Sequence, residues 1–205
     1  MPDGAILLLG GRSTRMGAPK AALDWHGRPL AVHVAEILRA AVDGPVVAVA
    51  APDQAVPALP PGVELVRDAA PHEGPLRGLE AGLAALDGRA DRAFTAAVDL
   101  PLLAPALVRA LLDVLDADTR AAVPDVDGLP QPLAAAYRVD ALEAVRALLA
   151  VGERRATALV DALNARRLDR SELLALPGVA AADPDLRSLV GANTPAAYER
   201  LHAGS

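Results

Sequence analysis

The 205-residue sequence contains no cysteine, and aromatic residues make up only 2% of it. Without cysteine there can be no disulfide framework, no thiolate metal site and no cysteine nucleophile. Acidic residues outnumber basic ones by 26 to 20, and the formal net charge of -6 argues against a general nucleic-acid-binding surface. No apolar run reaches about 18 residues without a charge, and the N-terminus lacks the pattern of a signal peptide. We therefore expect no membrane span, no nucleic-acid partner and a cytoplasmic location.

Hydrophobic residues nonetheless make up 53% of the chain. With so few aromatic residues, the core must be built from leucine, valine and alanine, which suits helices packed on a parallel sheet better than a sandwich or a small barrel. The length fits one α/β domain. No repeat, low-complexity tract or linker divides the chain, so residues 1–205 are expected to form a single domain.

In the first half of the chain, short apolar runs alternate with segments whose apolar residues recur at the period of a helix. Strands are predicted at residues 5–9, 45–50, 63–66 and 93–98, and helices at 29–41, through 79–86 and at 104–115. This alternation predicts an α/β fold with three layers, Rossmann-like, around a mostly parallel central sheet. Further on, strands are predicted at 121–124 and 131–137, and helices at 141–150, 156–164 and from 195 onward. Residues 166–189 fit no clear element.

The first predicted strand ends in a glycine-rich, basic loop that runs from Gly10 to Lys20. Three glycines and three cations lie within these eleven residues. Glycines let backbone N–H groups approach oxygen atoms, and the cations offset negative charge, so the loop predicts a polyphosphate site. Its spacing matches neither the P-loop nor the Gly-x-Gly-x-x-Gly dinucleotide fingerprint.

Two acidic residues, Asp68 and Asp99, follow later predicted strands. Because parallel sheets bind ligands at the carboxyl ends of their strands, the Gly10 loop, Asp68 and Asp99 are expected to meet at one edge. Each acid also has a plainer interpretation. Asp99 could cap the helix that begins near residue 104, and Asp68 could simply form a turn.

The loop Leu8-Leu9-Gly10-Gly11-Arg12-Ser13-Thr14-Arg15-Met16-Gly17-Ala18-Pro19-Lys20 resembles the signature loop of nucleotidyltransferases related to molybdenum-cofactor guanylyltransferase. The resemblance covers nearly the whole chain and keeps the family's order. It continues through Gly74-Pro75-Leu76-Arg77-Gly78-Leu79, Val98-Asp99-Leu100-Pro101, Gln131-Pro132-Leu133 and Asn193-Thr194-Pro195. The first loop is shared by several branches, and Gly-Pro-Leu-x-Gly-Leu with the later motifs points to the guanylyl branch. One departure is Gly191, which stands where the family's Asn-x-Asn-Thr-Pro pattern has asparagine.

The resemblance implies guanylyl transfer from GTP to the terminal phosphate of molybdenum-bound pterin, with Mg²⁺ and with release of pyrophosphate, during maturation of the molybdenum cofactor. It implies that Arg15, Lys20 and Asp99 are catalytic, and that Asp99 also holds Mg²⁺, which prefers one or two carboxylates plus phosphate oxygens. The acceptor would meet Gln131 and Asn193. The nucleotide would be bound by Leu8, Leu9, Gly10, Gly11, Lys20, Asp68, Gly74, Pro75, Leu76, Gly78 and Asp99.

Several alternatives remain open from the residues. Gln131 could bond only within a hairpin, Asn193 could cap the last helix, and Arg154 and Arg155 could either attract the pterin phosphate or begin a solvated helix. At the level of function, the rivals are a cytidylyltransferase for the same cofactor, another small-phosphate nucleotidyltransferase, and a non-catalytic nucleotide-binding accessory protein. The implied protein partners are cofactor-assembly proteins or molybdoenzymes, through transient contact.

Overall fold

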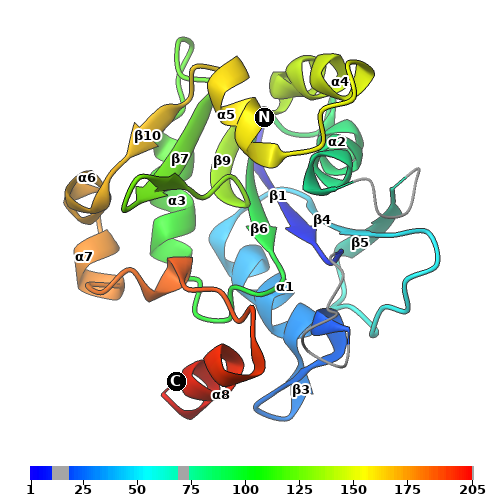
Figure 1. The fold of residues 1–205 in the computed structure, drawn as a ribbon, viewed down its shortest axis with the longest axis vertical. Helices are drawn as coiled ribbons and strands as arrows, with labels where there is room; N and C mark the ends of the chain where they lie inside the picture. The colour runs from blue at the N-terminus through cyan, green and yellow to red at the C-terminus, as the bar shows by residue number, and fades with distance from the viewer. Residues whose placement is uncertain (11–18, 69–73, 205) are drawn as a thin grey trace.

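The computed structural model describes residues 1–10, 19–68 and 74–204. Among these residues, a central sheet runs in the order β10-β7-β9-β6-β1-β4-β5, with β8 paired to β7 (Figure 1). Its strands are β1 (Asp3–Leu8), β4 (Val46–Ala50), β5 (Val63–Arg67), β6 (Arg92–Ala97), β7 (Ala121–Val126), β8 (Leu129–Pro130), β9 (Ala134–Arg138) and β10 (Arg166–Leu168).

The sheet is mostly parallel, as the sequence predicted. Strand β1 lies between β4 and β6 and is parallel to both, and β5 extends this parallel part beyond β4. Strand β9 is antiparallel to both of its neighbours, β6 and β7. The predicted three-layer α/β class is therefore confirmed, and the carboxyl ends of β1, β4, β5 and β6 share one edge.

Helices cover both faces of the sheet (Figure 1). On one face lie α1 (Leu30–Ala41) and α3 (Pro105–Val114), and on the other lie α2 (Pro75–Leu86), α4 (Leu142–Ala150) and α5 (Ala156–Ala162). Strand β1 serves both cores in alternation, with Ala5 and Leu7 in the first and Ile6 and Leu8 in the second. A strand covered on both faces has to be apolar throughout, which is why β1 reads as a continuous hydrophobic run.

Helix α2 packs very closely on β1. A Cβ added at Gly82 would lie 2.5 Å from Cγ2 of Ile6, and one added at Gly78 would lie 3.3 Å from Cδ2 of Leu8. Glycines four residues apart lie on the same face of a helix. The pair therefore sets the distance between the helix that follows the Gly74-Pro75 turn and the strand that leads into the Gly10 loop.

Residues 166–189, which the sequence left unassigned, contain β10, α6 (Arg170–Ala175), α7 (Val179–Ala182) and a 3-10 turn (Arg187–Leu189). The elements are three to six residues long, too short for a hydrophobic period to show. Leu173 and Val179 are fully buried in the first core. This segment therefore packs on the first core and leads the chain back toward the edge where β6 ends.

One strand boundary was wrong. The sequence predicted a strand at 131–137, whereas β9 begins at Ala134 because residues 131–133 form a turn. The N–H of Gln131 donates to Pro124 O at 2.8 Å, and the N–H of Ala134 donates to Gln131 O at 3.0 Å. Pro132 has no N–H to give to a ladder, which favours a turn at this point.

The last helix, α8 (Pro195–Ala203), packs against the small hairpin formed by β2 (Asp24–Trp25) and β3 (Arg28–Pro29) (Figure 1). The Trp25 ring lies 5.7 Å from the Tyr198 ring and 5.2 Å from the His202 ring, centroid to centroid. No helix within the described ranges is long and apolar enough to cross a membrane.

Candidate active site

Lys20 and Asp99 are 79 positions apart in the sequence and meet at the carboxyl edge of the sheet. Lys20 lies in the 3-10 turn Lys20–Ala22, and Asp99 follows the end of β6. The ammonium nitrogen Nζ of Lys20 is 2.6 Å from Oδ2 of Asp99, and the two side chains are 18% and 14% exposed. The structure thus brings together the two residues most important to the predicted site. Gly11 and Arg15 lie outside the described residues.

The alternative in which Asp99 caps helix α3 is wrong. The N-cap position of α3 is held by Ala104, and the backbone N–H of Ala104 donates to the hydroxyl of Ser188 at 2.8 Å. The Asp99 carboxylate is turned instead toward Lys20. The Asp99 side chain therefore forms part of the site at the sheet edge and does not cap the helix that follows.

Asn193 also contacts Lys20. Its Oδ1 accepts a hydrogen bond from Lys20 Nζ at 2.7 Å, across 173 positions of sequence. The expectation that Asn193 caps the last helix is wrong, because Thr194 does so: its Oγ1 accepts from the N–H of Ala197 at 3.2 Å. The Asn193 side chain is therefore available for a role at the site.

The segment that carries Asn193 is fixed to the Asp99 loop by the backbone and by two buried polar residues. The N–H of Ala192 donates to the Asp99 carbonyl oxygen at 2.8 Å. Asp183 accepts from the N–H groups of Arg187 and Ser188 at 2.7 and 2.9 Å, and so orders the turn before this segment. Sequence reasoning missed both residues, because no motif marks the Asp183 turn and because the hydroxyl of Ser188 accepts from Ala104, 84 positions away.

The end of β1 supplies a second part of the edge. Leu8 and Leu9 are buried, and the N–H of Leu9 donates to Val49 O at 2.8 Å. Gln54, which the sequence did not single out, donates from Nε2 to Leu9 O at 2.8 Å. The N–H of Asp68 donates to Ala50 O at 3.0 Å, which places Asp68 after β5 on the same edge, as predicted. Gly10 follows Leu9 and is exposed.

The start of helix α2 forms a third part. Gly74 has a φ of 88° and precedes Pro75 in the first helical turn. This left-handed conformation favours glycine, and a Cβ here would lie 2.8 Å from Arg154 O. Leu76 and Gly78 are buried in the second core, so at these positions the backbone, and not a side chain, would face a ligand.

A cavity of about 730 Å³ opens beside Asp99 and the start of α2. It brings together residues from most of the predicted motifs, and its lining includes Gly74, Pro75, Asp99, Gln131, Arg154, Arg155, Thr157, Gly191 and Asn193. A cavity of this size accommodates a ligand larger than a single phosphate group. Gln131 and Asn193, the two predicted acceptor contacts, therefore border the same space.

Glu153 fixes the arginine side of this cavity. Its Oε1 accepts from the N–H groups of Arg154 and Arg155 at 2.8 and 2.9 Å, and its Oε2 pairs with Arg155 Nη2 at 2.7 Å. The Arg155 guanidinium, followed by the backbone N–H groups of Arg155 and Arg154, lowers the pKa of Glu153 to about 2. The carboxylate is therefore charged at neutral pH and orders this turn.

Comparison with known proteins identifies the family to which this chain belongs. A model described as the MobA-like NTP transferase domain matches residues 5–168. The chain belongs to the MobA-like NTP transferase family. The predicted resemblance is confirmed, and the protein is a nucleotidyltransferase.

Individual relatives agree with this assignment. A protein of Mycobacterium tuberculosis named as a probable molybdenum cofactor guanylyltransferase is 39% identical over 172 residues, which are 82% of this chain and 84% of the relative. Among solved structures, molybdopterin-guanine dinucleotide biosynthesis protein A from Archaeoglobus fulgidus has a TM-score of 0.77 at 22% identity, covering 98% and 97% of the two chains. Rv0371C from Mycobacterium tuberculosis, in complex with manganese, has a TM-score of 0.65 at 18% identity and covers both chains fully.

The donor set of this nucleotidyltransferase suits a cation that is shared with its substrate. Within residues 1–10, 19–68 and 74–204, no group of three or more His, Cys, Asp or Glu side chains is placed to hold a metal ion. Asp99 offers a single carboxylate at the edge of the cavity. Mg²⁺ is commonly held by one or two carboxylates together with phosphate oxygens, so this residue fits such an ion.

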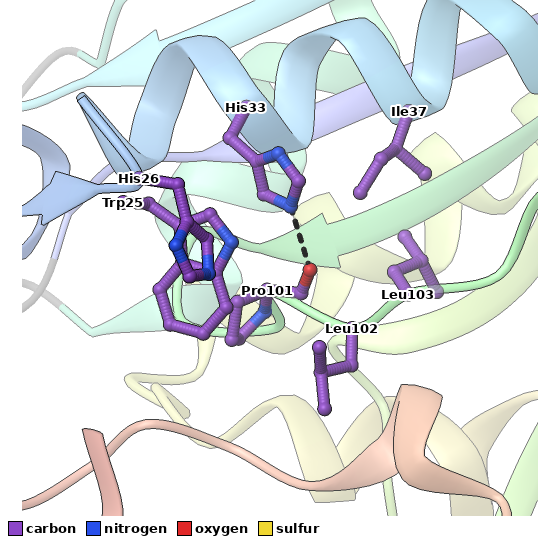
Figure 2. A pocket seen from close by; sticks show the side chains of 7 residues that line it. All are labelled: Trp25, His26, His33, Ile37, Pro101, Leu102 and Leu103. Carbon is purple, nitrogen blue, oxygen red and sulfur yellow. Dashed lines mark hydrogen bonds between the residues drawn. The ribbon is translucent and has the colours of Figure 1, made fainter. Parts of the chain in front are cut away.

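A side chain of helix α1 is hydrogen-bonded to the loop that follows Asp99. Figure 2 shows His33 directed at the carbonyl oxygen of Pro101, beside the rings of Trp25 and His26 in a cavity of about 370 Å³. His33 Nε2 donates to Pro101 O at 2.7 Å, and Arg28 donates to Nδ1 at 3.1 Å. These partners require the neutral ring with its proton on Nε2, and burial lowers the pKa of His33, which favours the same form.

Proposed function

We propose that this nucleotidyltransferase transfers the guanylyl group of GTP to the terminal phosphate of molybdenum-bound pterin and releases pyrophosphate. The observation that carries the proposal is the 2.6 Å contact between Lys20 and Asp99, the latter of which lines the cavity. Transfer of this kind depends on neutralising phosphate charge, which a cation and a carboxylate that can hold Mg²⁺ would provide. The choice of guanylyl rests on the name of the relative that is 39% identical.

In the proposed reaction, an oxygen of the acceptor phosphate attacks the α-phosphorus of GTP. The bond between the α-phosphorus and the bridging oxygen breaks, and pyrophosphate leaves with that electron pair. Such a transfer needs in-line positioning and neutralisation of charge more than it needs a protein nucleophile. We assign Lys20, with Arg15, to the departing pyrophosphate and Asp99 to Mg²⁺, which supplies further positive charge at the phosphates when bound.

The acceptor would occupy the cavity beyond Asp99. Arg154 and Arg155 lie on its lining and carry the charge that an anionic phosphate requires. Gln131 lies on the lining as well, and its own hydrogen bond to Leu129 O is long at 3.4 Å. We therefore place the nucleotide toward β1 and the start of α2, and the pterin phosphate toward Arg155 and Gln131.

The test is pyrophosphate release with Mg²⁺ and molybdenum-pterin, using GTP or CTP, with the product mass determined in parallel. Release with GTP and a guanylyl adduct support the proposal. Release with CTP alone would identify a cytidylyltransferase, and saturable nucleotide binding without release would identify an accessory protein. Lys20→Met should abolish release, whereas the control Arg89→Met removes a cation from an exposed ion pair with Glu64, away from the cavity lining, and should retain it.

A further inference from the structure

We propose that Asn193 is a positioning residue for Lys20 and therefore acts on the nucleotide side of the site. Gly191 leaves the space that the Asn193 amide needs for this role. This inference rests on the proposed role of Lys20 toward the triphosphate. It differs from the expectation that Asn193 meets only the acceptor. The starting observation is that Lys20 Nζ lies 2.7 Å from Asn193 Oδ1 and 2.6 Å from Asp99 Oδ2.

Lys20 is the only lysine in the 205 residues, and the other nineteen basic side chains are all arginines. An ammonium group is a compact charge with three donors that can point in different directions, whereas a guanidinium is a planar fork suited to bidentate pairing. Lys20 donates to two acceptors that come from different parts of the fold, the end of β6 and the segment before α8. The only lysine of the sequence thus lies where two acceptors, Asp99 and Asn193, come together from different parts of the fold.

The two acceptors affect the charge of Lys20 differently. The Asp99 carboxylate attracts the ammonium but also cancels its charge, so it competes with a phosphate. The Asn193 amide is neutral, so it can fix the direction of the ammonium without cancelling its charge. If Asp99 turns to a divalent cation, the Asn193 contact still holds Lys20 in place. Holding the side chain in advance reduces the entropy lost on binding a triphosphate.

Gly191 leaves the space that this arrangement needs. A Cβ at position 191 would lie only 2.6 Å from Asn193 Nδ2, so any other residue would push the amide away from its present place. The backbone between them is fixed, because Ala192 is buried and its N–H donates to Asp99 O at 2.8 Å. Asn193 does not cap helix α8, because the side chain of Thr194 does so. The amide is thus free of the cap and is oriented toward Lys20.

The first experiment measures GTP and GMP binding by calorimetry, with Mg²⁺ and without acceptor, for the wild-type protein and Asn193→Ala. Loss of one hydrogen bond to a charged, part-exposed group should weaken GTP binding about fivefold to tenfold. GMP lacks the β- and γ-phosphates, and its binding should change less than about twofold. In a Lys20→Met background, Asn193→Ala should add nothing, because the two residues act through one contact.

The second experiment tests Gly191. Gly191→Ala should weaken GTP binding by an amount similar to Asn193→Ala. In an Asn193→Ala background it should have little further effect, because the amide that it displaces is gone. Unfolding curves for each variant check that the fold is retained. A Gly191→Ala effect that persists undiminished in the Asn193→Ala background would overturn the role assigned to Gly191.

A spectroscopic readout needs no substrate. With isotopically labelled lysine, the protein gives one side-chain ammonium resonance, because Lys20 is the only lysine. Asn193→Ala should shift this resonance in the free protein, and GTP should shift it further. An unmoved resonance, or unchanged GTP binding with a raised KM for molybdenum-pterin, would overturn the inference and leave the proposed function standing. If Lys20→Met itself leaves GTP binding unchanged, the proposed nucleotide role of Lys20 fails first.

Discussion

Replacement of Asp99 by asparagine removes one charge and preserves the size of the side chain. The change replaces the carboxylate acceptor of the Lys20 ammonium by an amide, while the hydrogen bond to Asn193 Oδ1 is kept. Both members of the pair are less than one-fifth exposed, so water compensates only partly for the lost charge. Asp99→Asn should therefore lower both turnover and stability, for separable reasons.

The structure sets the size of each effect. Hydrogen bonds to charged groups contribute about 1.5–3 kcal/mol, and a neutral hydrogen bond about 1 kcal/mol. Replacing the charged hydrogen bond at Asp99 by a neutral one should thus lower the unfolding free energy by about 0.5–2 kcal/mol. For a domain of this length, each kcal/mol lowers the melting temperature by about 2–4 °C. Turnover should fall at least about 100-fold, which is typical when a group that stabilises transition-state charge is lost.

The assay is a double-mutant cycle with Lys20→Met, a side chain of similar length without charge. Each single variant removes one charge of the pair and keeps the other, whereas the double variant removes both charges. Its loss of stability should therefore be smaller than the sum of the single losses by about 1–2 kcal/mol. Turnover should not recover in the double variant, since the proposed roles of Lys20 at the pyrophosphate and of Asp99 at Mg²⁺ are both lost. Urea unfolding and pyrophosphate release measure the two quantities.

Two results would refute this reasoning. Stability losses that simply add would mean that the Lys20–Asp99 contact contributes nothing in solution. Near-normal turnover of Asp99→Asn would remove Asp99 from the metal role, whatever its effect on stability. Arg89→Met, which breaks an exposed ion pair with Glu64, serves as the matched control. It should change the unfolding free energy by only a fraction of a kcal/mol and leave turnover unchanged.

Three further predictions concern the support of the site. Tyr137→Phe removes a buried hydroxyl that donates to Pro132 O at 2.8 Å; it should lower the unfolding free energy by about 1–2 kcal/mol in urea, and an unchanged midpoint would contradict this. Burial lowers the pKa of His33, so the unfolded state binds its proton more readily and stability should decline as the pH falls below about 6.5; His33→Gln, which can still donate to Pro101 O, should flatten that decline. Gly82→Ala should lower the melting temperature, although alanine favours helices, because its Cβ would lie 2.5 Å from the β1 isoleucine; a raised value would show that α2 shifts without cost.

The first half of the fold follows directly from the sequence. Buried parallel strands must be apolar throughout, and amphipathic helices repeat with a period close to 3.6, so β1, α1, β4 and α2 were recognisable from local patterns. The rule that ligands lie at the carboxyl ends of parallel strands then placed Asp68, Asp99 and the Gly10 loop on one edge. Of that loop the structure describes Gly10, Pro19 and Lys20, and it confirms that Asp68, Asp99 and these residues lie at one edge.

The second half depended on contacts that no local pattern encodes. Strand β9 enters antiparallel between β6 and β7, and the elements between residues 166 and 189 are too short to show a period. Ser188 is a buried polar residue whose hydroxyl accepts from the N–H of Ala104, 84 positions away. Burial of a polar group depends on its partners, and partners are set by tertiary packing.

The sequence by itself determined the chemistry of this protein: a basic glycine-rich loop, an aspartate at a strand end and a set of motifs typical of nucleotidyltransferases. Only the tertiary structure decided which of these groups touch. Lys20, Asp99 and Asn193 are spread over nearly the whole chain, and local propensities carry no information about their separation. Their contact exists because the parallel sheet brings two strand ends to one edge, and because the Ala192–Asp99 hydrogen bond fastens the C-terminal segment against that edge.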